Sequence, residues 1–152
     1  MSKHAVFWIR DDFRIKNNPA LSYATNNHEC VSAIYIYNSS KFDQKREAQK
    51  WWISKSLTEF GKDLQKYNIN LEIFNSDEIN FFSKINKEKD LSVYWNKIYE
   101  PEELDIDKKL ISFFEKRKIN FKFFKGNVLN EFNKVNKNDG TPFKVYSPFW
   151  RN

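Results

Sequence analysis

Five short apolar runs divide the chain, and stretches with helical spacing of apolar residues lie between them. The runs are rich in β-branched and aromatic residues, and they cover residues 5–9, 31–37, 69–74, 91–95 and 119–124. A strand of a parallel sheet is buried on both faces, so it reads as a continuous apolar run rather than an alternating one. The alternation of strand and helix therefore predicts an α/β fold, with a doubly wound, five-stranded parallel sheet in a Rossmann-like three-layer sandwich.

Two of the helical stretches begin with clear start signals. Asn17 or Asn18 suits an N-cap, and Pro19 then fits the first turn of a helix. Pro101 opens another helix, and the two glutamates behind it face the positive end of the helix dipole. Each helix follows a predicted strand and a short polar loop, which is the order of elements that a parallel sheet requires.

Composition restricts the class of protein. A chain of 152 residues with 40% hydrophobic and 30% charged residues has enough apolar side chains for one globular domain. Lysine and arginine outnumber aspartate and glutamate by 26 to 20, but the lysines are scattered, which predicts a solvated basic surface rather than a nucleic-acid face. Only three glycines occur, and no G-x-G-x-x-G or P-loop pattern, so a glycine loop that cradles phosphate is excluded.

Metal, disulfide and membrane roles find no support in the sequence. Cys30 is the single cysteine, and His4 and His28 lack the spacing of metal ligands, so we expect no disulfide and no metal site. No apolar run approaches the roughly 20 residues that span a bilayer, and no signal peptide follows Met1. We therefore expect a cytoplasmic protein that does not enter a membrane.

Charged residues directly follow the first and fourth predicted strands. Arg10, Asp11, Asp12 and Arg14 come after the first strand, and the segment 96–103 comes after the fourth. The carboxyl ends of parallel strands share one edge of the sheet, and open α/β sheets bind ligands there, where the strand order reverses. These residues form either the rim of a ligand site or solvated loops that merely connect strand to helix.

Four blocks of sequence are similar to the family of DNA photolyases and cryptochromes. The first block lies within 8–21 and reads WIRDDFR, then NNPAL; it resembles the family's W-x-R-x-D-L-R and D-N-x-A-L. Phe13 stands in place of the usual leucine, and Asn17 in place of the usual aspartate. In the second block Arg46 precedes WW and SL, within 51–57, where the family has F-L and S-L.

The other two blocks extend the resemblance toward the end of the chain. The third contains Y-W-N at 94–96 and E-P at 100–101, followed by a charged helix start. The fourth, PFKVYSPFW at 142–150, resembles the family's P-Y-x-V-Y-x-P-F-W. The four blocks occur in the family's order and together span essentially the whole chain.

The resemblance implies the N-terminal α/β domain of a deoxyribodipyrimidine photolyase, with the strand order 3-2-1-4-5. Residues 1–130 would carry a light-harvesting antenna chromophore, and residues 131–152 would begin the connector to a helical FAD-binding domain that this chain lacks. The full-length flavoprotein, a lyase, would repair cyclobutane pyrimidine dimers by light-driven electron transfer from reduced FAD. Its partners would be its own C-terminal domain and damaged DNA. The protein would be a monomer, and this chain alone would hold no catalytic residue.

The sheet edge and the resemblance together indicate a set of cofactor-binding residues: Arg10, Asp12, Arg46, Asn96, Tyr99 and Glu103. The antenna chromophore would be methenyltetrahydrofolate or an 8-hydroxy-deazaflavin, with its ring against a tyrosine and an acidic tail toward Arg10 and Arg46. Neither chromophore is assigned, because Glu102 replaces the asparagine of folate binders and Ile98 replaces the acid of deazaflavin binders. The alternative is that these charges pair with one another across an empty groove.

Two other functions fit the same sequence. A cryptochrome sensory domain, which is not an enzyme, shares all four blocks. A generic nucleotide-binding α/β module, such as a relative of electron-transfer flavoproteins, shares the alternation of strands and helices. This last reading predicts that the isolated chain binds adenine nucleotides, which the photolyase reading does not.

Overall fold

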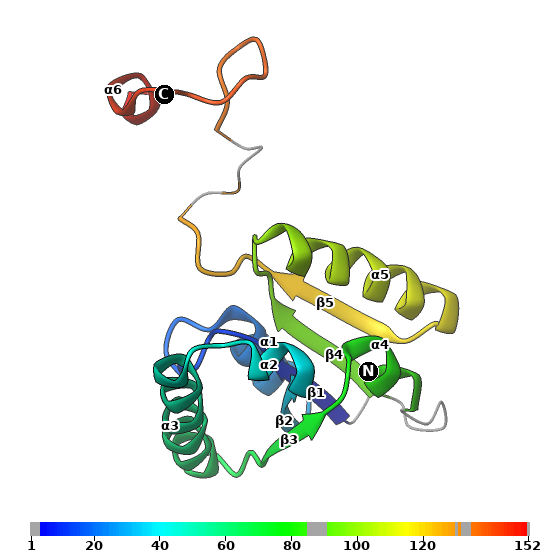
Figure 1. The fold of residues 1–152 in the computed structure, drawn as a ribbon. Coiled ribbons are helices and arrows are strands. Elements are labelled where there is room, and N and C mark those ends of the chain that lie inside the picture. The colour runs from blue at the N-terminus through cyan, green and yellow to red at the C-terminus, as the bar shows by residue number, and fades with distance from the viewer. Residues whose placement is uncertain (1–3, 85–90, 130, 132–134, 152) are drawn as a thin grey trace.

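The computed structural model describes residues 4–84, 91–129, 131 and 135–151, and Figure 1 shows how they fold. In chain order the elements are β1 (His4–Ile9), α1 (Pro19–Asn27), β2 (Cys30–Tyr37), α2 (Ser39–Asp43), α3 (Glu47–Gln65), β3 (Leu71–Asn75), α4 (Glu78–Lys84), β4 (Leu91–Asn96), α5 (Pro101–Arg117), β5 (Asn120–Phe124) and α6 (Tyr146–Trp150). Within these described ranges, no helix combines the length and the apolar character that crossing a bilayer requires.

The strands form one sheet in the order β3-β2-β1-β4-β5, and all four pairings are parallel (Figure 1). β1 lies at the centre, where Trp8 is level with Ile34 of β2 and with Trp95 of β4. The predicted fold class and strand order are therefore confirmed. Because the order reverses between β1 and β4, the carboxyl ends of these two strands mark the switch point of the sheet.

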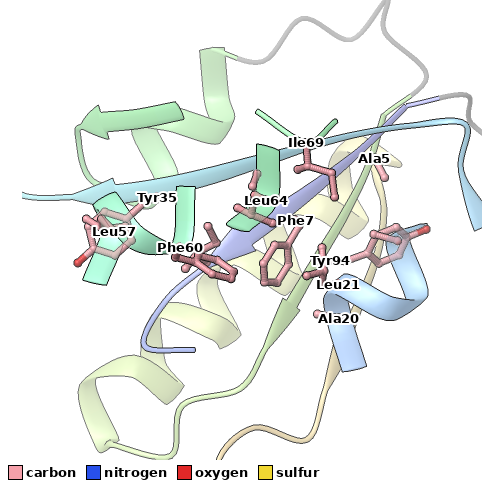
Figure 2. Close-up of a cluster of buried hydrophobic side chains, with 13 residues drawn as sticks. Ala5, Phe7, Ala20, Leu21, Tyr35, Leu57, Phe60, Leu64, Ile69 and Tyr94 are labelled. Carbon is pink, nitrogen blue, oxygen red and sulfur yellow. The ribbon is translucent and has the colours of Figure 1, made fainter. Parts of the chain in front are cut away.

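Helices α1 and α3 cover one face of the sheet. Phe7 of β1 packs there among Leu21 of α1, Phe60 and Leu64 of α3, and Tyr94 of β4, as Figure 2 shows. Each of these five side chains is at most 4% exposed. Burying an aliphatic or aromatic side chain of this size stabilises a fold by about 1.5–3 kcal/mol, so this cluster is a main source of stability.

Helices α4 and α5 cover the opposite face, and aromatic rings fill it. Trp8 lies 5.7 Å from Phe82 of α4 and 5.8 Å from Trp95 of β4, measured between ring centroids. Phe114 of α5 lies 5.0 Å from Phe82 and 6.0 Å from Trp95. Both faces of the central strand are thus covered, which explains why its sequence is apolar without a break.

The helix starts follow the sequence signals. The side chain of Asn18 accepts a hydrogen bond from the N–H of Leu21 at 3.1 Å, so Asn18 is the N-cap of α1 and Pro19 is its first residue. Asn17 adopts a left-handed conformation, with φ at 54°, which turns the loop into the helix. Pro101 opens α5 as predicted.

Some boundaries differ from the sequence predictions. β3 begins at Leu71 instead of Ile69, because Ile69 lies in the turn after α3, where its N–H donates to the carbonyl oxygen of Leu64 and its side chain is buried. The sequence does not predict α2 and α6, because a helix of five residues that buries none of them leaves no apolar period to detect. The sequence also predicts a short helix that Ser76 or Asp77 caps and that runs to about Asn86. The structure has α4 in this segment, and the predicted end near Asn86 lies outside the described residues.

Gly126, just after β5, passes very close to the loop that follows β4. A Cβ atom at this position would lie 1.8 Å from the carbonyl oxygen of Lys97, so only glycine fits. A Cβ atom on Gly61 of α3 would instead lie 3.4 Å from Leu71 Cδ2, which is close to an ordinary contact. At Gly126 the backbone that follows β5 therefore packs directly against the backbone of the loop that follows β4.

We expect Gly126→Ala to lower the free energy of unfolding by about 1–3 kcal/mol, because the backbone must shift to admit the methyl group. Gly61→Ala is the matched control, and it should raise the free energy of unfolding by about 0.4–1 kcal/mol, since alanine restricts the unfolded chain. Urea denaturation followed by circular dichroism measures both values. Equal stability of the two variants would contradict the close approach.

Candidate functional site

A cavity of about 220 Å³ opens at the carboxyl ends of β1 and β2 and beside the segment that follows β4, at the switch point of the sheet. Three isoleucines and Asn38 form part of its lining. The rest of the lining consists of four aromatic, four acidic and three basic side chains: Trp8, Tyr35, Tyr37 and Phe42; Asp11, Glu78, Glu100 and Glu103; and Arg10, Lys41 and Lys45. Segments that are distant in sequence therefore converge on one site, as the parallel sheet predicts.

Aromatic residues from both faces of the sheet line the cavity: Tyr35 belongs to the core under α1 and α3, and Trp8 belongs to the core under α4 and α5. Tyr35 and Tyr37 come from the end of β2, and Trp8 comes from the end of β1. Phe42 of α2 meets Tyr37 edge to face, with 5.6 Å between the ring centroids. Burial, more than any neighbouring charge, raises the pKa of Tyr35 to about 12, so its hydroxyl stays protonated and can donate a hydrogen bond. The aromatic residues of this lining suit a planar heteroaromatic ligand.

Arg10, the residue after β1, is buried in an ion-pair network. Its Nη1 donates to Asp107 Oδ1 at 2.7 Å, and its Nη2 donates to Glu103 Oε2. Trp95 Nε1 donates to the same oxygen of Asp107 at 3.1 Å. The guanidinium carbon of Arg10 lies 4.7 Å from the ring centroid of Trp8. Two carboxylates and one ring therefore engage Arg10 within the fold itself.

Asp107 lies behind the cavity and has one unsatisfied oxygen. Its Oδ2 atom is buried and has no hydrogen-bond partner in the described part of the chain, whereas Oδ1 accepts two hydrogen bonds. Burial raises the pKa of Asp107, although the charge of Arg10 opposes the shift. The sequence prediction omits Asp107, but its position four residues after Glu103, on one side of α5, is the signal that points to it.

Asp12 and Asn96 belong to a second buried network. Asp12 Oδ2 accepts hydrogen bonds from the amide groups of Asn96 and Asn18, and Asp12 Oδ1 accepts one from the N–H of Arg10 at 3.2 Å. Asn96 Oδ1 accepts a hydrogen bond from the N–H of Ala20 at 3.1 Å. Burial raises the pKa of Asp12, and the hydrogen bond from Asn96 opposes that shift. The network ties the loop after β1 and the end of β4 to the start of α1.

The structure brings four of the six expected binding residues to the switch point, in two roles. Arg10 and Glu103 line the cavity and pair with each other there. Asp12 and Asn96 are 8% exposed or less, and they lie in the amide network beside the cavity rather than in its lining. Their side chains shape the loops that carry the site.

The other two expected residues lie outside the cavity lining. Arg46 is exposed and directly precedes α3, while Tyr99 Oη donates a hydrogen bond to Glu131 Oε1 at 2.8 Å. Lys41 and Lys45 supply basic side chains to the cavity instead. Sequence reasoning missed these lysines, because Lys41 lies in α2, a helix too short to show an apolar period, and Lys45 lies in the loop two residues after that helix.

Two carboxylates of the cavity rim, Asp11 and Glu78, have raised pKa values. Desolvation, followed by the charge of Glu103, raises the pKa of Asp11. Desolvation also raises the pKa of Glu78, and the charge of Glu103 adds to that shift. Across the ranges that the structure describes, no group of three or more His, Cys, Asp or Glu side chains is arranged to hold a metal ion.

Comparison with known proteins gives consistent results. The family described as DNA photolyase matches residues 5–152. Deoxyribodipyrimidine photo-lyase of Agrobacterium fabrum is 29% identical over 147 residues, which cover 96% of this chain and 30% of that protein. The crystal structure of a bacterial class III photolyase from Agrobacterium tumefaciens matches with a TM-score of 0.86 and 27% identity, over 99% of this chain and 31% of that one. An archaeal photolyase from Sulfolobus tokodaii matches with a TM-score of 0.79 and 23% identity, over 88% of this chain and 32% of that one.

The structure is a doubly wound α/β domain with a cavity at the switch point of its sheet. Because the family match extends over residues 5–152, this chain belongs to the DNA photolyase family, and it corresponds to the N-terminal α/β domain of that family. The chain spans about a third of the length of these relatives.

We expect Asp107→Asn to gain stability relative to the unsubstituted chain as the pH rises from 3.8, the ordinary pKa of aspartate, through the raised pKa of Asp107 in the fold. With a raised pKa, the folded chain binds the proton more tightly than the unfolded chain, so ionisation of Asp107 costs stability over this range. An asparagine oxygen can still accept from Arg10 and Trp95 but does not ionise. Urea denaturation at a series of pH values measures the difference.

The exposed Asp105 on the same helix provides the control. Its hydrogen bond from Lys108 lowers the pKa of Asp105, so Asp105→Asn should lose relative stability over the acidic range in which Asp107→Asn gains it. The same sign of slope for both variants would show that the pKa of Asp107 is not raised in the fold.

Proposed function

We propose that this chain is the antenna domain of a deoxyribodipyrimidine photolyase and that the cavity at the switch point holds the light-harvesting chromophore. The cavity, lined by four aromatic residues in a domain of the photolyase family, is the observation that carries the proposal. An antenna must hold its chromophore in a fixed orientation, and aromatic residues at the end of a rigid parallel sheet support that. The structure of the archaeal relative is described as containing two FAD molecules, with the implication of a novel light-harvesting cofactor.

Methenyltetrahydrofolate and an 8-hydroxy-deazaflavin are the chromophores that we propose for the cavity. The residues present fit either ring system, because Tyr37 and Phe42 offer partly exposed aromatic surface and Asp11 offers acceptors for ring N–H groups. Arg10 acts as a positioning residue: held by Asp107, it keeps Glu103 at the cavity rim.

In the full-length protein, we propose, a helical domain beyond residues 1–130 holds FAD, and reduced FAD supplies the electron that splits cyclobutane pyrimidine dimers under light. Residues 131–152 would begin the connector to that domain. Their exposed aromatic side chains support this division: Tyr146 and Trp150 are 68% and 71% exposed and stack on each other, with 6.0 Å between ring centroids. The partners would be the FAD domain and damaged DNA, and the protein would act as a cytoplasmic monomer.

We expect the 152-residue chain to bind one of the two chromophores. Tyr37→Ala should weaken that binding by roughly tenfold, because the substitution removes one of the aromatic rings that line the cavity. Titration followed by chromophore fluorescence measures the dissociation constant. Tyr67→Ala is the matched control, since Tyr67 is 62% exposed and does not line the cavity. Arg46→Ala tests the family-based prediction for a residue outside the cavity. Failure of both chromophores to bind, or equal effects of the two tyrosine substitutions, would overturn the site.

We also expect that the 152-residue chain, supplied with FAD and a reductant, does not repair cyclobutane dimers under blue light. The reason is that the proposed FAD and lesion sites belong to the C-terminal domain. Recovery of thymine absorbance in a dimer-containing oligonucleotide measures repair, with a full-length photolyase as the positive control. Repair by the chain at the rate of that control would refute the division into antenna and catalytic domains.

A further inference from the structure

The cavity carries more negative than positive charge in its lining. Four carboxylates and three cationic side chains face it. The carboxylates come from separate segments: Asp11 follows β1, Glu78 opens α4, and Glu100 and Glu103 lie at the start of α5. The whole chain is basic, with a formal charge of +6, so this acidic cavity contrasts with the overall composition.

Arg10 does not provide a free positive charge for a ligand. Its side chain is 4% exposed and already donates to Asp107 and Glu103. Asp107 adds one more carboxylate behind the lining, so Arg10 and its two partners together have a net negative charge. Two carboxylates of the protein already surround this buried guanidinium, so an anionic ligand that approached Arg10 would meet their repulsion.

Asp11 and Glu78, at the rim of the cavity, lie where burial and a neighbouring carboxylate disfavour negative charge. Desolvation and the charge of Glu103 raise the pKa values of both Asp11 and Glu78. The charges of Asp11 and Glu103 also contribute to the raised pKa of Tyr35. Burial is the larger cause of both shifts and the charge of Glu103 adds to it, so a further anion in the cavity would meet desolvation together with repulsion from Glu103.

The two lysines compensate for this repulsion only in part. Lys41 Nζ lies 3.9 Å from Glu102 Oε2, and the side chain of Lys41 is 62% exposed. The charge of Lys41 also lowers the pKa of Glu78, as the charge of Lys45 lowers that of Asp11. Both lysines therefore already interact with carboxylates of the protein, and solvent and salt screen the exposed one.

We infer that the cavity selects a chromophore with an uncharged tail and discriminates against the same ring when its tail carries a phosphate or a carboxylate. The inference rests on the proposed function and names the ligand class of that site. Donor groups of a ring meet carboxylates that accept their hydrogen bonds, whereas an anionic tail meets repulsion. Asp11 and Glu78 determine the specificity, because both line the cavity and neither holds Arg10 in place. A deazaflavin with a ribityl tail satisfies this requirement, whereas a folate with its glutamate tail does not.

Two ligands that share one ring provide the test: 8-hydroxy-5-deazariboflavin and its 5′-phosphate. At low salt we expect the 152-residue chain to bind the unphosphorylated form at least roughly tenfold more tightly, and added salt to reduce the ratio. Asp11→Asn and Glu78→Gln should each reduce the ratio of the two dissociation constants by roughly threefold, by tighter binding of the phosphate. Ligand fluorescence measures the dissociation constants of both ligands, at low and at high salt, for each protein.

Glu115→Gln is the matched control, because it removes one negative charge from an exposed site on α5, about 18 Å along the helix from Glu103. Equal affinities for the two ligands, or tighter binding of the phosphate, would overturn the charge selection and leave the chromophore site standing. An effect of Glu115→Gln as large as that of Asp11→Asn would also overturn it, because net charge would then explain the ratio. If neither ligand binds and methenyltetrahydrofolate does not bind either, the proposed function itself fails.

Discussion

The region around the switch point depends on the burial of one guanidinium group. Arg10 stands where β1 ends, and it reaches across to α5, where Asp107 and Glu103 accept its hydrogen bonds. Removing one partner of a buried ion pair typically costs about 3–5 kcal/mol, because the remaining charge has no water to solvate it. The same group lies over Trp8 and, through Asp107, is linked to Trp95 of β4. One residue thus joins the two central strands to the helix that closes the cavity.

A second hydrogen-bond network, between Asp12 and the amide side chains of Asn18 and Asn96, lies beside this ion pair. Asp12 accepts from the backbone of Arg10 and from the side chains of Asn18 and Asn96, so the loop after β1 is bonded along its length. Asn96 also reaches the start of α1 through the N–H of Ala20. A loop held in this way leaves little conformational freedom to lose when a ligand binds, which favours a rigid chromophore site.

The charge of the cavity and the charge of the chain have different consequences. The excess of lysine lies mainly on the surface, where solvent and salt screen its charge. The acidic lining acts at short range inside a partly desolvated space, where charges interact more strongly. The net charge of the chain therefore does not indicate which ligand charge the cavity favours, whereas the side chains that line the cavity do.

The sequence by itself determined the framework of this protein. Continuous apolar runs specify strands buried on both faces, and Asn18 with Pro19, like Pro101, marks a helix start through contacts a few residues long. The family blocks added the strand order, which no local pattern encodes. Charged residues after the first and fourth strands were sufficient to indicate the edge of the sheet at which the cavity lies.

Only the tertiary structure decided which charged side chains at this edge of the sheet line the cavity. Arg10 and Asp107 are 97 positions apart, and their hydrogen bond exists because parallel strands bring distant segments to one edge. Lys45 lines the cavity from the loop between α2 and α3, while Arg46, its neighbour, lies outside the lining. Spacing along the chain determines the path of the backbone, but the direction in which a loop side chain points depends on partners that folding brings together.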